Sequence, residues 1–115
     1  MNQNNAGLEA EKLAATFLIN HGLKMVAQNY HCRFGEIDLI MMDAKTLVFV
    51  EVRLRTNQQY GNAGASITAQ KKQKLILTAQ HHLQTHGESQ CRFDAILMHS
   101  VDVKSIEWVR NAFDA

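Results

Sequence analysis

Two stretches of the chain repeat their apolar residues every three or four positions, which is the spacing of an amphipathic helix. The first is residues 8–20, and Gly22 follows it where a helix end favours a left-handed residue. The second begins at Ser66 or Thr68, either of which can act as its cap, and runs to about residue 86. We therefore predict one helix near the start of the chain and a longer one in its second half.

Other stretches are rich in β-branched and aromatic residues and predict strands. The predicted strands are residues 24–30, 36–42, 47–53, 91–99 and 105–110. Residues 43–46 are few enough to join two of them as a hairpin, whereas residues 56–65 form a longer polar loop before the second helix. The order is helix, about three strands, helix and then one or two strands, which predicts an α/β fold with a mixed central sheet flanked by helices.

The composition is that of an ordinary globular chain, and it narrows the classes of function. With 115 residues the chain can bury one core, so we predict a single domain over residues 1–115. The net charge is +1, so any attraction for nucleic acid must come from a local cluster. The two cysteines form neither a disulfide framework nor a zinc motif. No signal peptide or apolar run of membrane length is present, so we expect a cytoplasmic protein with no membrane association.

Three carboxylates lie inside the two clearest strands, where an apolar hairpin would not need them. Because side chains alternate faces along a strand, Glu36, Asp38 and Ile40 are predicted to share one face of the first strand. Glu51 and Arg53 share a face of the second strand in the same way. A hairpin with its turn midway between the strands places Asp38 opposite Glu51. The same register places Glu36 opposite Arg53, and a shift of one residue would turn the acids onto a purely apolar face.

Carboxylates that face each other across two strands repel, because their Cβ atoms are only about 4.5–5.5 Å apart. Such a pair costs stability unless one acid is protonated or a cation lies between them. Mg²⁺ or Mn²⁺ would suit, since hard divalent ions take oxygen ligands and typically use one or two carboxylates. Asp38 and Glu51 are therefore a candidate metal site. The residues alone leave an alternative open: Glu36 and Arg53 form a solvated ion pair, and the other two acids face water at a sheet edge.

The residues around this hairpin resemble those of a known family. The segments that carry the resemblance are EKLAATFLINHG, NYHCRFGEIDLI, LVFVEVRLR, KKQKL and RFDAIL. Together they are similar to the YraN-like family of small bacterial proteins, which in turn resembles the PD-(D/E)XK nuclease superfamily. The resemblance covers most of the chain. It implies a restriction-endonuclease-like fold and a nuclease that hydrolyses phosphodiester bonds in DNA with the help of a divalent metal ion.

The resemblance also implies roles for particular residues. Asp38 and Glu51 correspond to the two acids of the superfamily motif. The backbone carbonyl of Val52 would complete the metal shell, and Glu11 matches a glutamate of the first helix that lies near the metal in related nucleases. Lys71 matches a lysine at the start of the long helix, for which contact with a phosphate is the expected role.

One position departs from the motif, which has a lysine where this chain has Arg53. In the superfamily that lysine helps to position or activate the attacking water. Arginine keeps the positive charge and can stabilise charge on a phosphate, but it does not lose a proton near neutral pH. Arg53 is thus a candidate catalytic residue that would act only through its positive charge. Arg55 lies on the same face and is a candidate contact for a phosphate. The departure also supports an alternative, a nucleic-acid-binding module whose catalytic site is impaired.

Three lysines near the start of the long helix form a basic cluster, consisting of Lys71, Lys72 and Lys74. Beside an acidic metal site such a cluster would contact the phosphates of a nucleic acid, most simply DNA. The alternative is an ordinary solvated helix face, and with it an interaction protein that has no nucleic-acid role. A domain of this size has little surface with which to grip a duplex, so formation of a homodimer is left open.

Two smaller constellations have mainly structural interpretations. His82 and His86 lie four residues apart on the predicted helix, which is the spacing of a metal pair, but the sequence offers no third ligand beside them. Arg92 and Asp94 alternate onto one face of their strand and are expected to form a polar pair that supports the sheet.

Overall fold

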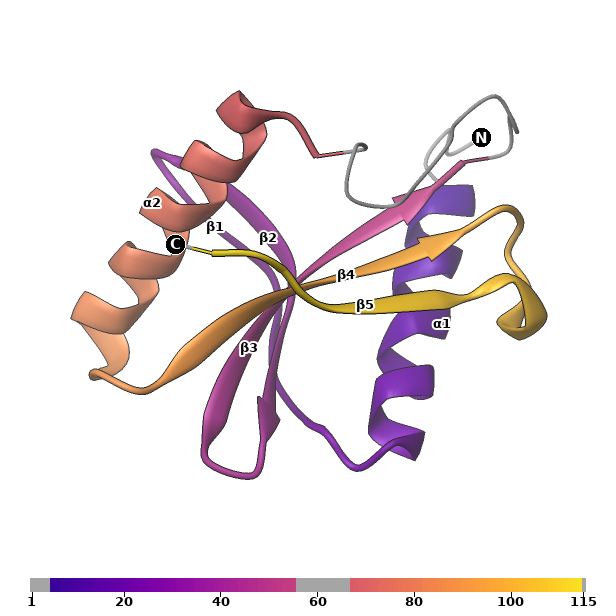
Figure 1. Ribbon diagram of the computed structural model, residues 1–115, viewed down its shortest axis with the longest axis horizontal. Coiled ribbons are helices and arrows are strands. Elements are labelled where there is room, and N and C mark those ends of the chain that lie inside the picture. Colours follow the sequence, from indigo (N-terminus) through magenta and orange to yellow (C-terminus); the bar gives the residue numbers. More distant parts are fainter. Residues whose placement is uncertain (1–4, 56–66, 115) are drawn as a thin grey trace.

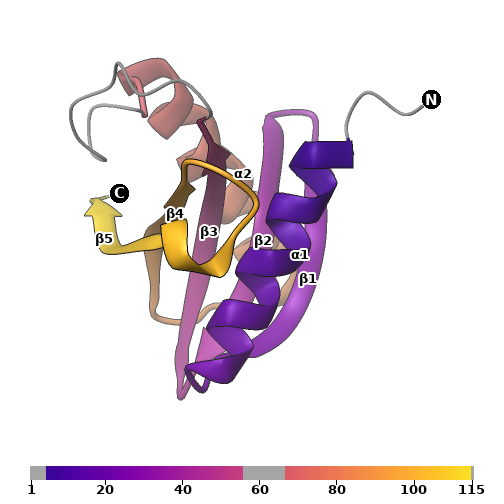
Figure 2. The ribbon, with the colours of Figure 1, turned by 90° about the vertical axis from the view of Figure 1, so that its right-hand side faces the viewer.

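The computed structural model describes residues 5–55 and 67–114, so the polar loop predicted over residues 56–65 lies outside the described part. Its elements in chain order are α1 (Asn5–Asn20), β1 (Lys24–Cys32), β2 (Gly35–Asp43), β3 (Thr46–Leu54), α2 (Ala69–His86), β4 (Cys91–Met98), the 3₁₀ helix η2 (Val103–Ser105) and β5 (Glu107–Phe113). The strands form one sheet in the order β1 to β5, in which only β3 and β4 are parallel. The two helices cover opposite faces of this sheet (Figures 1 and 2).

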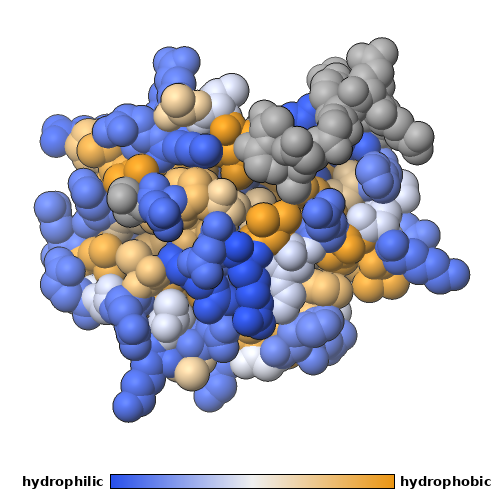
Figure 3. All heavy atoms as spheres, in the orientation of Figure 1, coloured by the Kyte–Doolittle hydropathy of each residue, from blue (hydrophilic) through white to orange (hydrophobic). Residues whose placement is uncertain are grey.

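The predicted fold class is confirmed, and the arrangement is consistent with a restriction-endonuclease-like fold. None of the helices in residues 5–55 and 67–114 is long and apolar enough to cross a membrane. On the face of the molecule seen in Figure 3, hydrophilic and apolar residues are interspersed rather than gathered into one extended area.

Each face of the sheet buries its own core. The core beneath α1 contains Ala10, Ala14, Leu18, Leu39, Met41, Val48, Val50, Ile96 and Met98. The core beneath α2 contains Ile37, Ile40, Leu47, Phe49, Leu75, Ala79, Phe93 and Ala95. Consecutive residues of β3 therefore enter opposite cores, as the period of two predicts. Small alanines on the buried stripe of α1 let this helix lie close to the sheet.

The helices agree with their apolar stripes and differ mainly at one end. α1 begins at Asn5, earlier than predicted, because its first turn contributes no core residue and leaves no trace in the apolar pattern. It ends before Gly22, whose φ of 97° is in the left-handed region. α2 is capped by Thr68, whose Oγ1 accepts a hydrogen bond from the backbone N–H of Lys71 at 3.1 Å.

The hairpin of β2 and β3 has the predicted register. Its backbone pairs run from Asp43 with Thr46 up to Leu39 with Val50, and Ala44 in the turn has φ 55°. The preceding turn is tighter than expected. β1 continues to Cys32, which pairs with Gly35, so only two residues form the turn. The polar side chains at the end of this edge strand hide its continuation in the sequence.

A buried aspartate ties the last two strands together and confirms the predicted polar pair. Asp94 is 1% exposed and accepts hydrogen bonds at 3.0 Å from Arg92 Nε, from Trp108 Nε1 and from the backbone N–H of Asn111. Arg92 Nη2 also lies 3.0 Å from Asp43 Oδ2, at the end of the central hairpin. The pairing of β4 with β5 is irregular beside Asp94, and this bulge explains why β5 runs past the predicted end at residue 110.

Replacing Asp94 by alanine should destabilise the fold strongly. The change leaves the partly buried guanidinium of Arg92 without its main partner and two further donors without an acceptor. We expect the free energy of unfolding to fall by roughly 3 kcal/mol or more, measured by urea denaturation followed by circular dichroism. Glu107→Ala, an exposed change on the neighbouring strand, should stay within about 0.5 kcal/mol of the wild type. Equal, small effects of the two changes would contradict the assigned role of Asp94.

Candidate metal and nucleic-acid site

The alternation of side chains in β2 breaks next to Asp38. Ile37 and Ile40 both belong to the core beneath α2, whereas Leu39 between them belongs to the core beneath α1. In a regular strand residues 37 and 39 would share a face. The prediction that Glu36, Asp38 and Ile40 share one face is therefore wrong, because the strand is irregular at this point.

The neighbouring strand has a matching irregularity at Asn29. This residue has φ 51°, in the left-handed region, between Gln28 and Tyr30, which both pair regularly with β2. Asparagine is one of the few residues that tolerates this conformation. Its side chain donates a hydrogen bond from Nδ2 to Glu11 Oε1 at 3.1 Å. Asn29 thus links the irregular part of the sheet to α1, a role for which we had no prediction.

The carboxylate of Asp38 lies where β2 and β3 part from each other. The regular pairs of these strands stop at Leu39 and Val50, and beyond that point β3 continues only with β4. Figure 1 shows the two strands diverging away from their shared turn. Asp38 Oδ2 accepts a hydrogen bond from the backbone N–H of Val52 at 2.8 Å. The Asp38 carboxylate therefore accepts a hydrogen bond from a backbone N–H of β3 at a point where β2 no longer pairs with that strand.

Glu51 occupies the α2 side of β3, as Phe49 does two residues earlier. It is only 5% exposed, so it does not face water as the alternative interpretation requires. Its Oε2 lies 3.4 Å from Arg53 Nη1 and 3.5 Å from Lys71 Nζ. Arg53 thus pairs with Glu51 of its own strand rather than with Glu36. The site brings together a strand acid, a strand arginine and a lysine from the first turn of α2.

The acids of the site influence one another. The pKa of Asp38 is raised to about 7, first by burial and next by the charge of Glu51, while the hydrogen bond from Val52 acts in the opposite direction. The pKa of Glu11 is also raised, by burial and then by the charge of Glu36, and contact with Asp38 partly offsets this. Near neutral pH the site is therefore poised to take up a proton or a cation.

The donor atoms fit a hard divalent ion, although in this arrangement they are held by other partners. Glu11, Asp38 and Glu51 offer only carboxylate oxygens, the ligands that Mg²⁺ and Mn²⁺ prefer. Glu51 is engaged by Lys71 and Arg53, and one oxygen of Glu11 by Asn29. In the described residues no group of three or more His, Cys, Asp and Glu side chains is placed to hold a metal ion. A bound ion would have to compete with the cations at Glu51.

The three lysines of the predicted basic cluster on α2 have three different surroundings. Lys71 reaches the acids, whereas Lys72 Nζ lies 5.7 Å above the ring centre of Phe113, at the end of β5. Lys74 lies beside the turn of β1 and β2, since a Cβ on Gly35 would be 3.6 Å from its own Cβ. Arg55 follows β3, and its backbone N–H bonds to the carbonyl of Met98 at 2.8 Å. Of these three lysines, Lys71 has an ion pair with an acid of the site in the described residues.

The histidines on α2 pack against one another. The rings of His82 and His86 stack with centroids 4.2 Å apart, and His82 is 3% exposed. Tyr30 of β1 lies edge-on to the His82 ring, and its hydroxyl contacts His81. These contacts favour a packing role over the metal pair that the spacing suggested.

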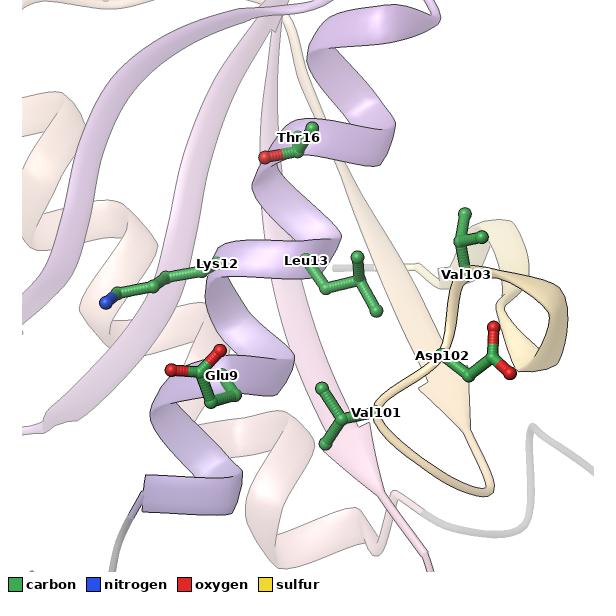
Figure 4. Close-up of a pocket in the computed structure, with 7 residues that line it drawn as sticks. All are labelled: Glu9, Lys12, Leu13, Thr16, Val101, Asp102 and Val103. Carbon is green, nitrogen blue, oxygen red and sulfur yellow. The ribbon is translucent and has the colours of Figure 1, made fainter.

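A groove lies apart from the acids, between α1 and the connection from β4 to β5. It has a volume of about 510 Å³ and is lined by Glu9, Lys12, Leu13, Thr16, Val101, Asp102 and Val103. Figure 4 shows Leu13 and Val101 turned toward one another, while Lys12 points away. None of the carboxylates discussed above lines this groove.

The comparisons with known proteins place the chain in a family. A family model described as uncharacterised protein family UPF0102 matches residues 10–98. The chain belongs to the UPF0102 family. The matched segment includes Glu11, Asp38, Glu51 and Lys71, and so the whole candidate site. The YraN-like resemblance predicted from the sequence is thereby confirmed.

Several UPF0102 proteins are similar to this chain over almost its whole length. A UPF0102 protein of Methylobacillus flagellatus is 57% identical over 109 residues, covering 95% of this chain and 96% of the relative. A second, from Nitrosospira multiformis, is 54% identical over 109 residues, with 94% and 92% covered. A third, from Nitrosomonas europaea, is 53% identical over 111 residues, with 96% and 94% covered. These names identify the UPF0102 family and assign it no activity.

Replacing Asp38 by asparagine should stabilise the metal-free protein in a pH-dependent way. An acid whose pKa is raised in the folded state does not lower the free energy of unfolding below about pH 4, because there it is protonated in both the folded and the unfolded protein. The cost grows as the pH rises towards 7 and stays constant above that value. We therefore expect Asp38→Asn to raise the free energy of unfolding by roughly 1–3 kcal/mol at pH 8 and hardly at all at pH 4.

Urea denaturation at the two pH values measures this difference. Asparagine keeps an oxygen that can accept from the Val52 N–H, so the hydrogen bond survives the change. Glu36→Gln, at an exposed acid of the same strand, should give a smaller gain. A variant Asp38→Asn that is less stable than the wild type at pH 8 would show that the acids do not repel in the folded protein.

Proposed function

We propose that this UPF0102 protein is a divalent-metal-dependent nuclease that hydrolyses phosphodiester bonds in DNA. The observation that carries the proposal is the position of two acids at the fork between β2 and β3: Asp38, held there by the Val52 N–H, and the buried Glu51. Burial first, and the charge of Glu51 next, raise the pKa of Asp38 to about 7. A fold that only needed stability would not keep interacting acids in this partly buried place. The cations Arg53 and Lys71 lie beside the same acids, where a phosphate would have to approach.

In this proposal the metal ion is Mg²⁺ or Mn²⁺, held by Asp38 and Glu51 with help from Glu11 and the carbonyl of Val52. A bound ion of this kind would activate a water molecule and neutralise charge on the phosphate. The hydrogen bond from the Val52 N–H fixes one oxygen of Asp38 and so sets the direction of the other. Asn29 has the corresponding effect on Glu11.

Arg53 supplies charge but no base. Its guanidinium remains protonated near neutral pH and can bind a phosphate oxygen while it stays close to Glu51. Arg55, Lys71, Lys72 and Lys74 would add contacts with the nucleic-acid backbone, and binding should weaken as the salt concentration rises. A protein that acts on DNA would work in the cytoplasm. Formation of a homodimer would enlarge the small surface that one copy offers to a duplex.

A second candidate function is binding of nucleic acid without cleavage. The observation that favours it is Arg53 itself, which stands where the superfamily motif has a lysine and lies against Glu51. General-base assistance is typically worth about 10²–10⁴-fold in rate, so its loss can reduce cleavage to a low level.

Titration of Mn²⁺ followed by calorimetry tests the proposed metal site. We expect the wild type to bind Mn²⁺, and both Asp38→Ala and Glu51→Ala to weaken binding by roughly tenfold or more because each removes a carboxylate ligand. Asp102→Ala, at an exposed acid in the connection between β4 and β5, is the control and should bind as the wild type does. A wild type that binds no Mn²⁺ would exclude this site.

Incubation with branched, single-stranded and duplex DNA in the presence of Mn²⁺ then separates the two functions. Cleavage that disappears in both Asp38→Ala and Glu51→Ala supports the nuclease. Salt-sensitive binding without any product supports the binding module. Absence of both binding and product at low salt would exclude either function.

A further inference from the structure

We infer that Lys71 is an exchangeable internal cation of the site: it neutralises Glu51 when no metal ion is bound, and it transfers to a phosphate of the nucleic acid when a metal ion takes Glu51. This inference rests on the proposed function and adds a means by which metal binding regulates nucleic-acid binding. It concerns a residue for which the sequence suggested only phosphate contact.

The first support is the burial of Glu51. Its side chain is 6% exposed, and an ionised carboxylate at such a position needs a charged partner. Two cations meet that need through the same oxygen, Oε2: Lys71 Nζ at 3.5 Å and Arg53 Nη1 at 3.4 Å. A divalent ion at this oxygen would repel both, and at least one of them would have to move.

The second support is the difference between the two cations. Arg53 lies two residues from Glu51 on the same face of β3, so its backbone is held beside that acid by the sheet. Lys71 belongs to another element, and its side chain is 41% exposed compared with 28% for Arg53. A lysine side chain is a flexible stem that carries a compact charge, so it can leave one oxygen for another at little cost. Lys71 is therefore the cation that can exchange.

The third support is the way in which α2 holds Lys71. The Thr68 hydroxyl accepts a hydrogen bond from the Lys71 backbone N–H, so the first turn of the helix is fixed while the charged end remains free to turn. The ammonium group therefore stays within reach of the acids when it leaves Glu51. A phosphate held at the metal ion would lie within the same region, and the released charge would attract it.

Two linked effects follow from the exchange. Lys71 competes with the metal ion, so its charge weakens metal binding in the free protein. The released charge then strengthens nucleic-acid binding in the metal-bound protein. Because coupling between two ligands is reciprocal, nucleic acid must also strengthen metal binding by the same factor. Removal of the lysine charge should change the two affinities in opposite directions.

Lys71→Met tests the exchange, because methionine keeps an unbranched apolar stem and removes the charge. Its matched control is Lys72→Met, at the adjacent lysine whose ammonium group lies over Phe113. Calorimetry measures Mn²⁺ binding to each variant. Fluorescence anisotropy with a phosphorothioate-protected oligonucleotide measures nucleic-acid binding with and without Mn²⁺.

We expect Lys71→Met to bind Mn²⁺ about two- to fivefold more tightly than the wild type, which is the effect of removing one partly exposed ion pair. The same variant should lose most of the gain in oligonucleotide affinity that Mn²⁺ gives the wild type. Lys72→Met should bind Mn²⁺ as tightly as the wild type does. Its oligonucleotide affinity should rise on addition of Mn²⁺ by the same factor as in the wild type, even where its affinity without Mn²⁺ is lower.

The outcomes separate this inference from the proposed function. If the wild type binds Mn²⁺ through Asp38 and Glu51 but Lys71→Met binds it equally or more weakly, the exchange is overturned and the metal site stands. If both lysine variants lose the metal-dependent gain equally, general charge rather than exchange is the cause. If the wild type binds no Mn²⁺, the proposed metal-dependent function fails and the exchange fails with it. Thermal unfolding of each variant shows whether a loss reflects misfolding.

Discussion

The hydrogen bond from the Val52 N–H to Asp38 is the interaction on which the site depends. It is formed where β2 leaves β3, so a side chain takes the place of a strand partner at the point where the sheet opens. Buried backbone donors require an acceptor, and here the acceptor is also a charged candidate ligand. The acid therefore cannot be removed or turned away without exposing a backbone donor of β3. One bond thus connects the integrity of the sheet with the chemistry of its open end.

The fold brings charges of opposite sign to this open end from different elements. Glu11 comes from α1, on one side of the sheet, and Lys71 from α2, on the other. Glu51 lies between them on the central strand and is too buried to be neutralised by solvent. Burial, and next the charge of Glu51, raise the pKa of Asp38. The acids and cations of the site therefore act on one another, while the Lys71 side chain, which is 41% exposed, also remains in contact with solvent.

Much of this architecture could be predicted from the sequence, because period and register are properties of the chain itself. The alternation of Val48, Phe49 and Val50 was enough to assign each face of β3, and the short turn was enough to align β2 with it. The same reasoning failed at Asp38, where a left-handed Asn29 on the neighbouring strand interrupts the alternation. A backbone irregularity of this kind produces no periodic pattern in the sequence. The sequence indicates it here only by an asparagine within a polar strand.

The charged residues show a second limit of sequence reasoning. Lys71 and Lys72 are neighbours in the chain and equal in charge, yet only the first reaches Glu51. Consecutive residues on a helix point about 100° apart, so their partners depend on where the helix lies over the sheet. Asp94 could be predicted to pair with Arg92, but its bonds to Trp108 and Asn111 depend on how β5 bulges against β4. The sequence pattern thus identifies the charged residues that matter, whereas the groups they contact depend on how the helices and strands pack.

Trp108 is the single tryptophan of the chain, and its surroundings make it an intrinsic optical probe. Its indole N–H bonds to Asp94, and its ring lies edge-on to Phe17 of α1 and to His21 in the turn after that helix. The guanidinium of Arg110 lies 4.3 Å above the same ring. The emission of this indole should therefore respond when α1 separates from the sheet. Because α1 also carries Glu11, a spectroscopic signal from the far end of the helix can report on the element that supplies one acid of the site.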